Sequence, residues 1–278
     1  MKHHILIPTD FSDNAWTAAK YALQLYANEA CTFYFSHAWT FINSGVRTQL
    51  SESYIKPFRD EAKANLAEVV QAAKAETSND AHEFESIFSI GSVEDAIEFA
   101  VKEKGITMVV MGTKGASGAQ EFLFGSNTVS VVNKMRSCPV LLVPDNFSYR
   151  KPLKIVFPSD FNRFFGDELQ VIRAMADLHN SHIDVLHIHK EESLNAKQKE
   201  NVAMLKTYFE AYKHQFNWLS DSGKKEQAIT TFIKEENADM LTMINYEHSF
   251  VENLIKEPVI KKMGYHSLVP FLVIPRVD

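Results

Sequence analysis

The sequence predicts an α/β protein built from two tandem, doubly wound, parallel five-stranded sheets. Near-continuous apolar strands alternate with helical segments, which is typical of a parallel sheet covered on both faces. The same unit also occurs twice. Residues 4–11 (HILIPTDF) recur 150 positions later as residues 154–161 (KIVFPSDF), and residues 139–144 (PVLLVP) recur 131 positions later as residues 270–275 (PFLVIP). We therefore infer a duplication whose second copy is 19 residues shorter, with right-handed crossovers in each half.

The boundary between the copies falls in a short polar stretch, residues 145–152 (DNFSYRKP). Clusters of this composition are typical of linkers. We expect a first domain over residues 1–146 and a second over residues 151–278.

The elements of the first copy follow from its apolar runs and helix caps. A helix from about Ser12 to Asn28 and a longer one from about Ser51 to Ala75 are expected between strands. Ser92, with Glu94 and Asp95 behind it, predicts a further helix start, and Gly105 predicts its end. The expected strands of this copy are residues 4–8, 31–37, 83–89, 106–111 and 139–143. In the second copy they are residues 153–158, 183–188, 239–244 and 270–274, with a poorly marked one within 214–220.

Composition and charge argue against several classes of protein function. Acidic residues outnumber basic ones, 35 to 29, for a net charge of -6, which argues against nucleic-acid and membrane-surface partners. The opening MKHHILIPTDFSD lacks a long apolar segment and no run reaches about 18 apolar residues, so we expect no signal peptide, no membrane span and a cytoplasmic location. Cys31 and Cys138 lie in apolar runs and are expected to be buried thiols.

Four of the ten glycines, Gly112, Gly115, Gly118 and Gly125, follow the strand that ends at Met111. Ligands of an open α/β sheet bind outside the carboxyl ends of its strands. Glycine allows backbone N–H groups to approach an anion, and a helix N-terminus supplies unpaired N–H donors. Lys114 adds a charge, and Ser126 and Thr128 add hydroxyl groups. This loop predicts a ligand that carries phosphate, although a plain surface loop is the alternative.

The two common nucleotide fingerprints, G-x-x-x-x-G-K-[ST] and G-x-G-x-x-G, are absent. Instead, Gly112-x2-Gly115-x9-Gly125-Ser126 matches the pattern of the ATP-binding universal stress proteins. The opening ILIPTDFSDNAWTAAKYALQL and the segment MGTKGASGAQEFLFGSNTVSVVNKMRSCPVLLVP resemble that family too. The resemblance extends over essentially the whole chain, as a tandem arrangement, and implies an adenine nucleotide alpha hydrolase-like, Rossmann-like fold.

The resemblance also implies a nucleotide site in the first copy. Asp10 would contact the adenosine part, with Pro8 and Thr9 beside it, and Ala38 would line the adenine pocket. The loop would hold the ribose and phosphates through Met111, Gly112, Lys114, Gly115, Gly125, Ser126, Asn127 and Thr128. ATP, with Mg²⁺ at its phosphates, is the expected cofactor, and no catalytic residue or protein metal site is expected.

The second copy departs from this pattern. Asp160 keeps the position of Asp10, but the glycines are replaced. With the offset of 131 taken from the closing strand, the residues at the positions of Gly112, Gly115, Gly125 and Ser126 are Met243, Tyr246, Lys256 and Glu257. We expect that the second copy does not bind ATP in the manner of the family.

The favoured function is a stress-response or signalling module that acts through nucleotide-dependent conformation on an unknown protein partner. The family resemblance implies that the two copies form a pseudo-dimer, often through their last strands, and that two chains can associate further into a homodimer. One alternative is a slow ATPase, which needs a metal and a group to position water, for which Asp10 is the only candidate. A scaffold without nucleotide, or a site for a lipid or cyclic nucleotide, are the others.

Three further features have two interpretations each. His187 and His189 share a strand face and could bind a metal, but His37 aligns with His187, which favours packing. Phe122, Leu123 and Phe124 could cover the nucleotide or form an oligomer contact. An aromatic set is interpreted as core or interface packing: Tyr208, Phe209, Tyr212, Phe216 and Trp218.

Overall fold

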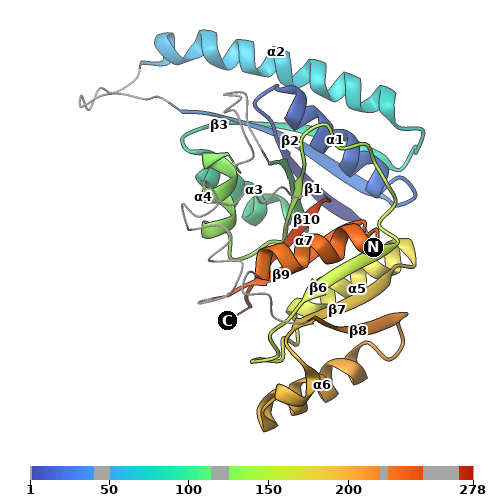
Figure 1. The fold of residues 1–278 in the computed structure, drawn as a ribbon. Coiled ribbons are helices and arrows are strands. Elements are labelled where there is room, and N and C mark those ends of the chain that lie inside the picture. The colour runs from blue at the N-terminus through green and yellow to red at the C-terminus, as the bar shows by residue number, and fades with distance from the viewer. Residues whose placement is uncertain (1, 41–50, 114–124, 220–224, 247–268, 278) are drawn as a thin grey trace. The chain divides into compact units, whose positions relative to one another are not determined.

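The computed structural model describes residues 2–40, 51–113, 125–219, 225–246 and 269–277. The chain divides into two compact units, and the break lies between Tyr149 and Arg150. Each unit is a parallel sheet with helices packed on it, which confirms the predicted fold class (Figure 1).

The first unit has five strands in the order β3-β2-β1-β4-β5, and every pair is parallel. Its centre is apolar: Ile5, Leu6 and Ile7 of β1 are fully buried. The strands are β1 (His3–Pro8), β2 (Cys31–Trp39), β3 (His82–Ile90), β4 (Met108–Gly112) and β5 (Val140–Val143).

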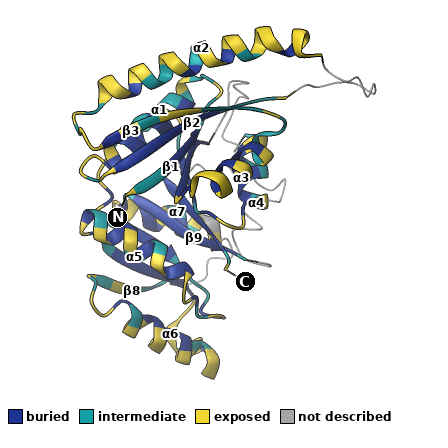
Figure 2. Cartoon of the chain, turned by 180° about the vertical axis from the view of Figure 1, so that it is seen from behind, coloured by how far each residue is buried: buried dark blue, intermediate teal, exposed yellow. Residues whose placement is uncertain are grey.

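Four helices cover this sheet: α1 (Asp13–Leu25), α2 (Glu52–Glu76), α3 (Val93–Lys104) and α4 (Ser126–Lys134). α1 contacts α2 over one face, and α3 contacts α4 over the other (Figure 1). Figure 2 shows the inner strands of the sheet buried between these layers, while the edge strand β3 and the outer faces of the helices are more exposed. This is the doubly wound arrangement, which brings the helix N-termini to the carboxyl edge of the sheet.

The second unit repeats the architecture, with the strand order β10-β9-β6-β7-β8 and parallel pairing throughout. Its strands are β6 (Lys154–Pro158), β7 (His182–Ile188), β8 (His214–Leu219), β9 (Met240–Asn245) and β10 (Phe271–Pro275). The helices among its described residues are α5 (Glu168–His179), α6 (Ala196–Tyr208) and α7 (Lys225–Glu235), with a short 3-10 turn, η1 (Glu191–Ser193). The poorly marked third strand is therefore real, as β8.

Helix starts in the first unit agree with the caps that the sequence predicts. The side chains of Ser12, Ser51 and Ser92 accept hydrogen bonds from backbone N–H groups in the first turns of α1, α2 and α3. α3 ends at Gly105, whose φ of 60° is in the left-handed region. A glycine has no Cβ to oppose that conformation, so the helix can stop there without strain.

The duplication is visible in the turn after the first strand of each unit. Thr9 N–H donates to Ser36 O at 2.8 Å, and the equivalent Ser159 N–H donates to Leu186 O at 2.9 Å. His37 Nδ1 donates to Thr9 O at 2.9 Å, just as His187 Nδ1 donates to Ser159 O at 2.7 Å. The two units therefore share a turn built from the same hydrogen bonds.

Strand register corrects the alignment of the two copies by one residue. β1 pairs Ile5 with Met108, and β6 pairs Ile155 with Met240, so the offset at the fourth strand is 132 and not 131. The structural equivalent of Gly112 is therefore Ile244. The offset of 131 holds only at the last strand, where Val109 pairs with Val140 and Leu241 with Phe271. One residue fewer between β9 and β10 explains the error.

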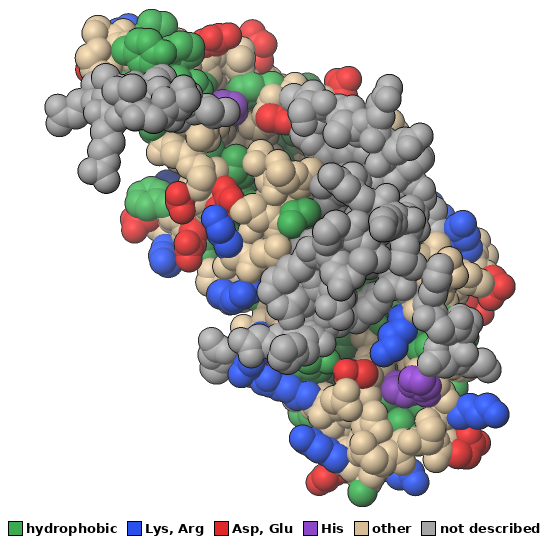
Figure 3. All heavy atoms as spheres, turned by 60° about the vertical axis from the view of Figure 1, so that its left-hand side comes forward, with side chains coloured by type: hydrophobic (Ala, Val, Ile, Leu, Met, Phe, Trp, Pro, Cys, Tyr) green, Lys and Arg blue, Asp and Glu red, His purple; other side chains and the backbone are tan. Residues whose placement is uncertain are grey.

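Acidic and basic side chains are interspersed on the described surface that Figure 3 shows, in keeping with a net charge of only -6. Cys31 and Cys138 are free and buried, as expected. Burial raises the pKa of each thiol to about 12, so neither is a reactive thiolate at neutral pH. Among the helices of the described residues, none has the length and apolar character that crossing a bilayer requires.

Candidate functional site

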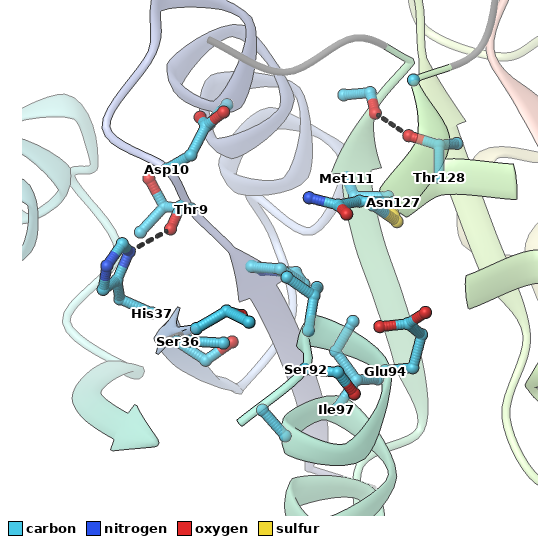
Figure 4. Close-up of a pocket in the computed structure, with 18 of the residues that line it drawn as sticks. Thr9, Asp10, Ser36, His37, Ser92, Glu94, Ile97, Met111, Asn127 and Thr128 are labelled. Carbon is cyan, nitrogen blue, oxygen red and sulfur yellow. Dashed lines mark hydrogen bonds between the residues drawn. The ribbon is translucent and has the colours of Figure 1, made fainter. Parts of the chain in front are cut away.

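A cavity of about 390 Å³ opens in the first unit at the carboxyl ends of β1, β2 and β4 (Figure 4). The N-termini of α3 and α4 complete its wall. This is where the topology of an open α/β sheet places its ligands, because the crossover helices begin at this edge on both faces.

Ten of the twelve residues that the sequence singles out line this one cavity. They are Pro8, Thr9, Asp10, Ala38, Met111, Gly112, Gly125, Ser126, Asn127 and Thr128. The other two, Lys114 and Gly115, lie outside the described residues, as do Phe122, Leu123 and Phe124. Residues up to 120 positions apart in the sequence thus meet around one space.

The cavity also has walls that sequence reasoning missed. β2 contributes Ser36 and His37, and Thr40 follows its end. The start of α3 contributes Ser92, Val93, Glu94, Ala96 and Ile97. The sequence held a signal for the second group, since the Ser92 cap predicts a helix start directly after a strand. In a parallel sheet such a start lies at the same edge as the end of β1.

Asp10 is held at the rim by its own turn. Its Oδ1 accepts hydrogen bonds from Ser12 N–H at 3.1 Å and from Ser12 Oγ–H at 2.6 Å. The helix cap is Ser12 itself, whose Oγ accepts from Ala15 N–H at 3.3 Å. Because Ser12 performs the capping, the exposed carboxylate of Asp10 is oriented without being consumed as a cap.

The N-terminus of α4 is tied to the end of β4. Gly125 N–H donates to Thr113 O at 2.7 Å, and the buried Thr128 Oγ–H donates to Gly112 O at 3.2 Å. Gly125 is the N-cap and provides no side-chain acceptor, while Ser126 and Asn127 are exposed. Among the described residues, the first N–H groups of this helix therefore have no side-chain cap and can receive an anion. The hydroxyl hydrogen of Thr128 is used within the protein, so Ser126 is the hydroxyl donor left for a ligand.

The N-terminus of α3 has the opposite character. Ser92 Oγ accepts from Asp95 N–H at 3.1 Å, and Glu94 and Asp95 place two carboxylates in the first turn. Glu94 accepts hydrogen bonds from Ser130 and Lys134 of α4. Burial alone would raise the pKa of Glu94, but these hydrogen bonds lower it, so the side chain stays ionised. With its cap filled by Ser92 and carboxylates in its first turn, the start of α3 is less suited to an anion than the start of α4.

The corresponding corner of the second unit is occupied by the protein itself. Tyr246 Oη–H donates to Asp160 Oδ2 at 3.0 Å, and burial together with Asp160 raises the pKa of the Tyr246 hydroxyl. Gln198 Nε2 donates to the backbone oxygen of Asp160 at 2.9 Å. With Ile244 in place of Gly112, the end of β9 also carries a bulky side chain. Asp160 thus accepts a hydrogen bond from the residue that follows the end of the fourth strand, in addition to those within its own turn.

The histidine pair and the aromatic set have structural roles in the second unit. The ring of His187 stacks on Phe161 with 4.7 Å between centroids, and His37 stacks on Phe11 in the same way at 4.6 Å. The described residues contain no cluster of three metal-ligating side chains. Phe209 is fully buried, and Tyr208 and Tyr212 pack on Arg173. These contacts support the packing interpretation of both features.

Comparison with known proteins adds the family context. Residues 1–144 match the model of the universal stress protein family. Universal stress protein YxiE of Bacillus subtilis (strain 168) is 32% identical over 92 residues, which are 33% of this chain and 62% of that protein. The chain therefore aligns with less than two thirds of the length of this curated relative.

Solved structures with the same fold span the whole chain. A universal stress protein of Archaeoglobus fulgidus DSM 4304 has a TM-score of 0.72 at 20% identity and covers 99% of this chain and 97% of its own. A functionally unknown protein of Pseudomonas aeruginosa PAO1 has a TM-score of 0.58 at 11% identity, with 99% and 92% covered. At these identities the likeness establishes the fold, and it extends through both units.

Proposed function

The chain belongs to the universal stress protein family, and we propose that its first unit binds ATP as part of a stress-response or signalling module. The observation that carries the proposal is the N-terminus of α4, which has glycine as its cap and opens into the cavity beside Asp10. A helix start without a side-chain acceptor is suited to phosphate.

The polarity of the cavity sets the orientation of the ligand. Phosphate groups belong at α4, where backbone N–H groups and the Ser126 hydroxyl are available, because Glu94 gives α3 a negative charge. The adenosine part then lies toward Asp10 and Ala38, as the family resemblance implies. Mg²⁺ would accompany the phosphates and neutralise part of their charge.

One nucleotide per chain is the expected stoichiometry. In the second unit Tyr246 already occupies a hydrogen-bonding position on Asp160, and Ile244, near the end of the fourth strand, takes the place of Gly112. We propose that this unit serves as a structural or regulatory partner of the first. Pairing of the two units within the chain, and of two chains with one another, are predictions of the same resemblance.

Titration calorimetry of nucleotide-stripped protein with Mg-ATP tests the proposal. The expected result is saturable binding of about one ATP per chain. Asp10→Asn should weaken binding about tenfold, since a hydrogen bond to a charged group is worth about 1.5–3 kcal/mol. Gly125→Glu should abolish measurable binding, because a carboxylate would then stand at the phosphate end.

The duplication offers a matched control. Asp160→Asn changes the same residue in the same turn of the second unit, and it should leave the affinity and stoichiometry unchanged. Two nucleotides per chain, or equal losses in the two Asp variants, would contradict a single site in the first unit. Absence of saturable binding would reject the nucleotide and favour a scaffold. A phosphate-release assay on the same samples separates binding from slow hydrolysis.

A further inference from the structure

A second cavity of about 250 Å³ lies in the first unit between α1 and α2, behind the turn that carries Asp10. Three aromatic side chains line it: Phe11 from the turn, Trp16 from α1 and Phe35 from β2. Phe35 is fully buried, whereas Phe11 and Trp16 are half-buried. The space therefore has an apolar interior with two aromatic rings at its entrance.

Its charged side chains are all acidic. Asp13 of α1 and Glu68 of α2 line the cavity and are exposed, and neither lysine nor arginine is among its described lining residues. The described ion pairs near the start of α2 join Arg59 to Glu52 and Lys56 to Asp60. Since Asp13 and Glu68 form no ion pair among the described residues, their negative charges are not neutralised within this part of the protein.

Among the described residues of the second unit, the equivalent turn is closed. Phe161, the counterpart of Phe11, is 1% exposed. α6 closes over it, with Asn201 Nδ2 donating to Phe161 O at 2.8 Å. With the offset of 150, Arg163 stands at the position of Asp13 and Gly166 at that of Trp16. The shared turn can therefore form without a cavity beside it. In the first unit the cavity is present together with the aromatic and acidic side chains that line it.

We propose that this cavity is a second binding site, for a small organic cation with an apolar body, such as an aromatic or alkyl amine. Aromatic ring faces attract a cation, and the two carboxylates supply the opposite charge, while the buried floor takes the apolar part. The site is distinct from the proposed nucleotide cavity. The two share Thr9 in their walls, and Phe11 of one stacks on His37 of the other.

NMR of the full-length, nucleotide-free protein with ¹⁵N-labelled tryptophan tests this inference. The chain has three tryptophans, and Trp16→Phe identifies the resonance of the one in the cavity. Benzylamine, a cation at neutral pH, is titrated against benzyl alcohol, a neutral probe of nearly the same shape. The expected result is a saturable shift of the Trp16 indole signal with benzylamine and at least about threefold weaker binding of benzyl alcohol.

Charge-neutralising variants make the test specific. Glu68→Gln and Asp13→Asn should each weaken benzylamine binding about threefold to fivefold without affecting benzyl alcohol. Glu61→Gln, an exposed position on the same helix that does not line the cavity, should leave it unchanged. Gly125→Glu should also bind benzylamine normally, which separates this site from the nucleotide proposal. A Trp16 signal that does not shift, or equal binding of the two probes, would overturn the inference.

Discussion

At the scale of single residues, Phe11 and Phe161 adopt an unusual backbone conformation. Their φ values are 65° and 56°, in the left-handed region that an aromatic residue rarely enters. Such a conformation costs about 1–3 kcal/mol. Their N–H groups donate to Thr9 Oγ1 and Ser159 Oγ, and each ring stacks on a histidine. These contacts offset the strain and hold the turn in one shape.

The histidine in the second unit makes that stability dependent on pH. Burial lowers the pKa of His187 below its ordinary value of 6.5, although its hydrogen bond to Ser159 opposes the effect. The unfolded chain therefore takes up the proton first as pH falls. Stability from this group is fully present above about pH 6.5 and is lost as the pH drops through the lowered folded pKa.

We accordingly predict that acidification from about pH 7.5 to pH 5.5 lowers the urea midpoint of the second unit, and that His187→Gln reduces this fall. The variant is less stable at pH 7.5, because its ring contacts are lost, so the relevant quantity is the difference between the two pH values. Circular dichroism measures the urea midpoint of each protein at the two pH values. The same pH sensitivity in variant and wild type would exclude His187 as the group responsible.

At the scale of elements, the ends of α3 and α7 show two solutions to one problem. α3 stops at Gly105 with φ 60°, and the equivalent position after α7 is Asn237 with φ 50°. The following N–H groups bond alike: Ile106 N–H donates to Val101 O at 3.3 Å, and Ala238 N–H donates to Ile233 O at 3.0 Å. The left-handed residue is therefore a requirement of the helix end, and glycine and asparagine both meet it.

Replacing Gly105 with alanine should lower the free energy of unfolding by about 1 kcal/mol, and Gly105→Asn should lower it by less than half of that. No heavy atom lies within 4 Å of a Cβ added at Gly105, so the loss reports backbone strain and not a steric clash. Denaturant titration measures both variants. Equal losses for alanine and asparagine would contradict the left-handed conformation as the cause, because asparagine tolerates that conformation better than alanine does.

At the scale of the whole molecule, the two copies differ in length at three places. His37 pairs with Phe88, 51 positions later, whereas His187 pairs with Trp218, 31 positions later, so 20 residues are missing between β7 and β8. The loss accompanies a shorter crossover helix: α2 has 25 residues and α6 has 13. Two residues are gained before β9 and one is lost before β10. The longer α2 is the helix that supplies Glu68 to the second cavity.

Hydrogen exchange on the intact chain should distinguish the units. If ATP occupies the first unit only, Mg-ATP should slow exchange in the turn around Asp10 and at the start of α4, because bound ligand suppresses local opening. Residues 159–162, the same turn in the second unit, should exchange at an unchanged rate. Protection of both turns would mean that the second unit also binds the nucleotide or responds to it.

Much of the fold could be predicted because it is encoded locally. Apolar runs mark the strands, and Ser12, Ser51 and Ser92 mark helix starts that the structure reproduces. The predicted counterpart of Gly112 in the second copy was wrong by one residue. The offset was taken from the last strand, and the segment between β9 and β10 is one residue shorter than that between β4 and β5. The α3 wall had a local signal in the Ser92 cap, whereas the cavity beside Trp16 depends on how α1 and α2 pack on the sheet, which no local pattern specifies.

The Tyr246–Asp160 hydrogen bond is one of the features by which the two copies have diverged since the duplication. Duplication gives two identical copies, and each then keeps what selection demands of it. Both copies have kept the strained phenylalanine and its histidine, but only the first has kept the glycines. The geometry of the turn is therefore shared by both units even though the glycines are not. A substitution at this turn in the first unit can therefore be compared with the same substitution at the equivalent turn of the second unit, within one molecule.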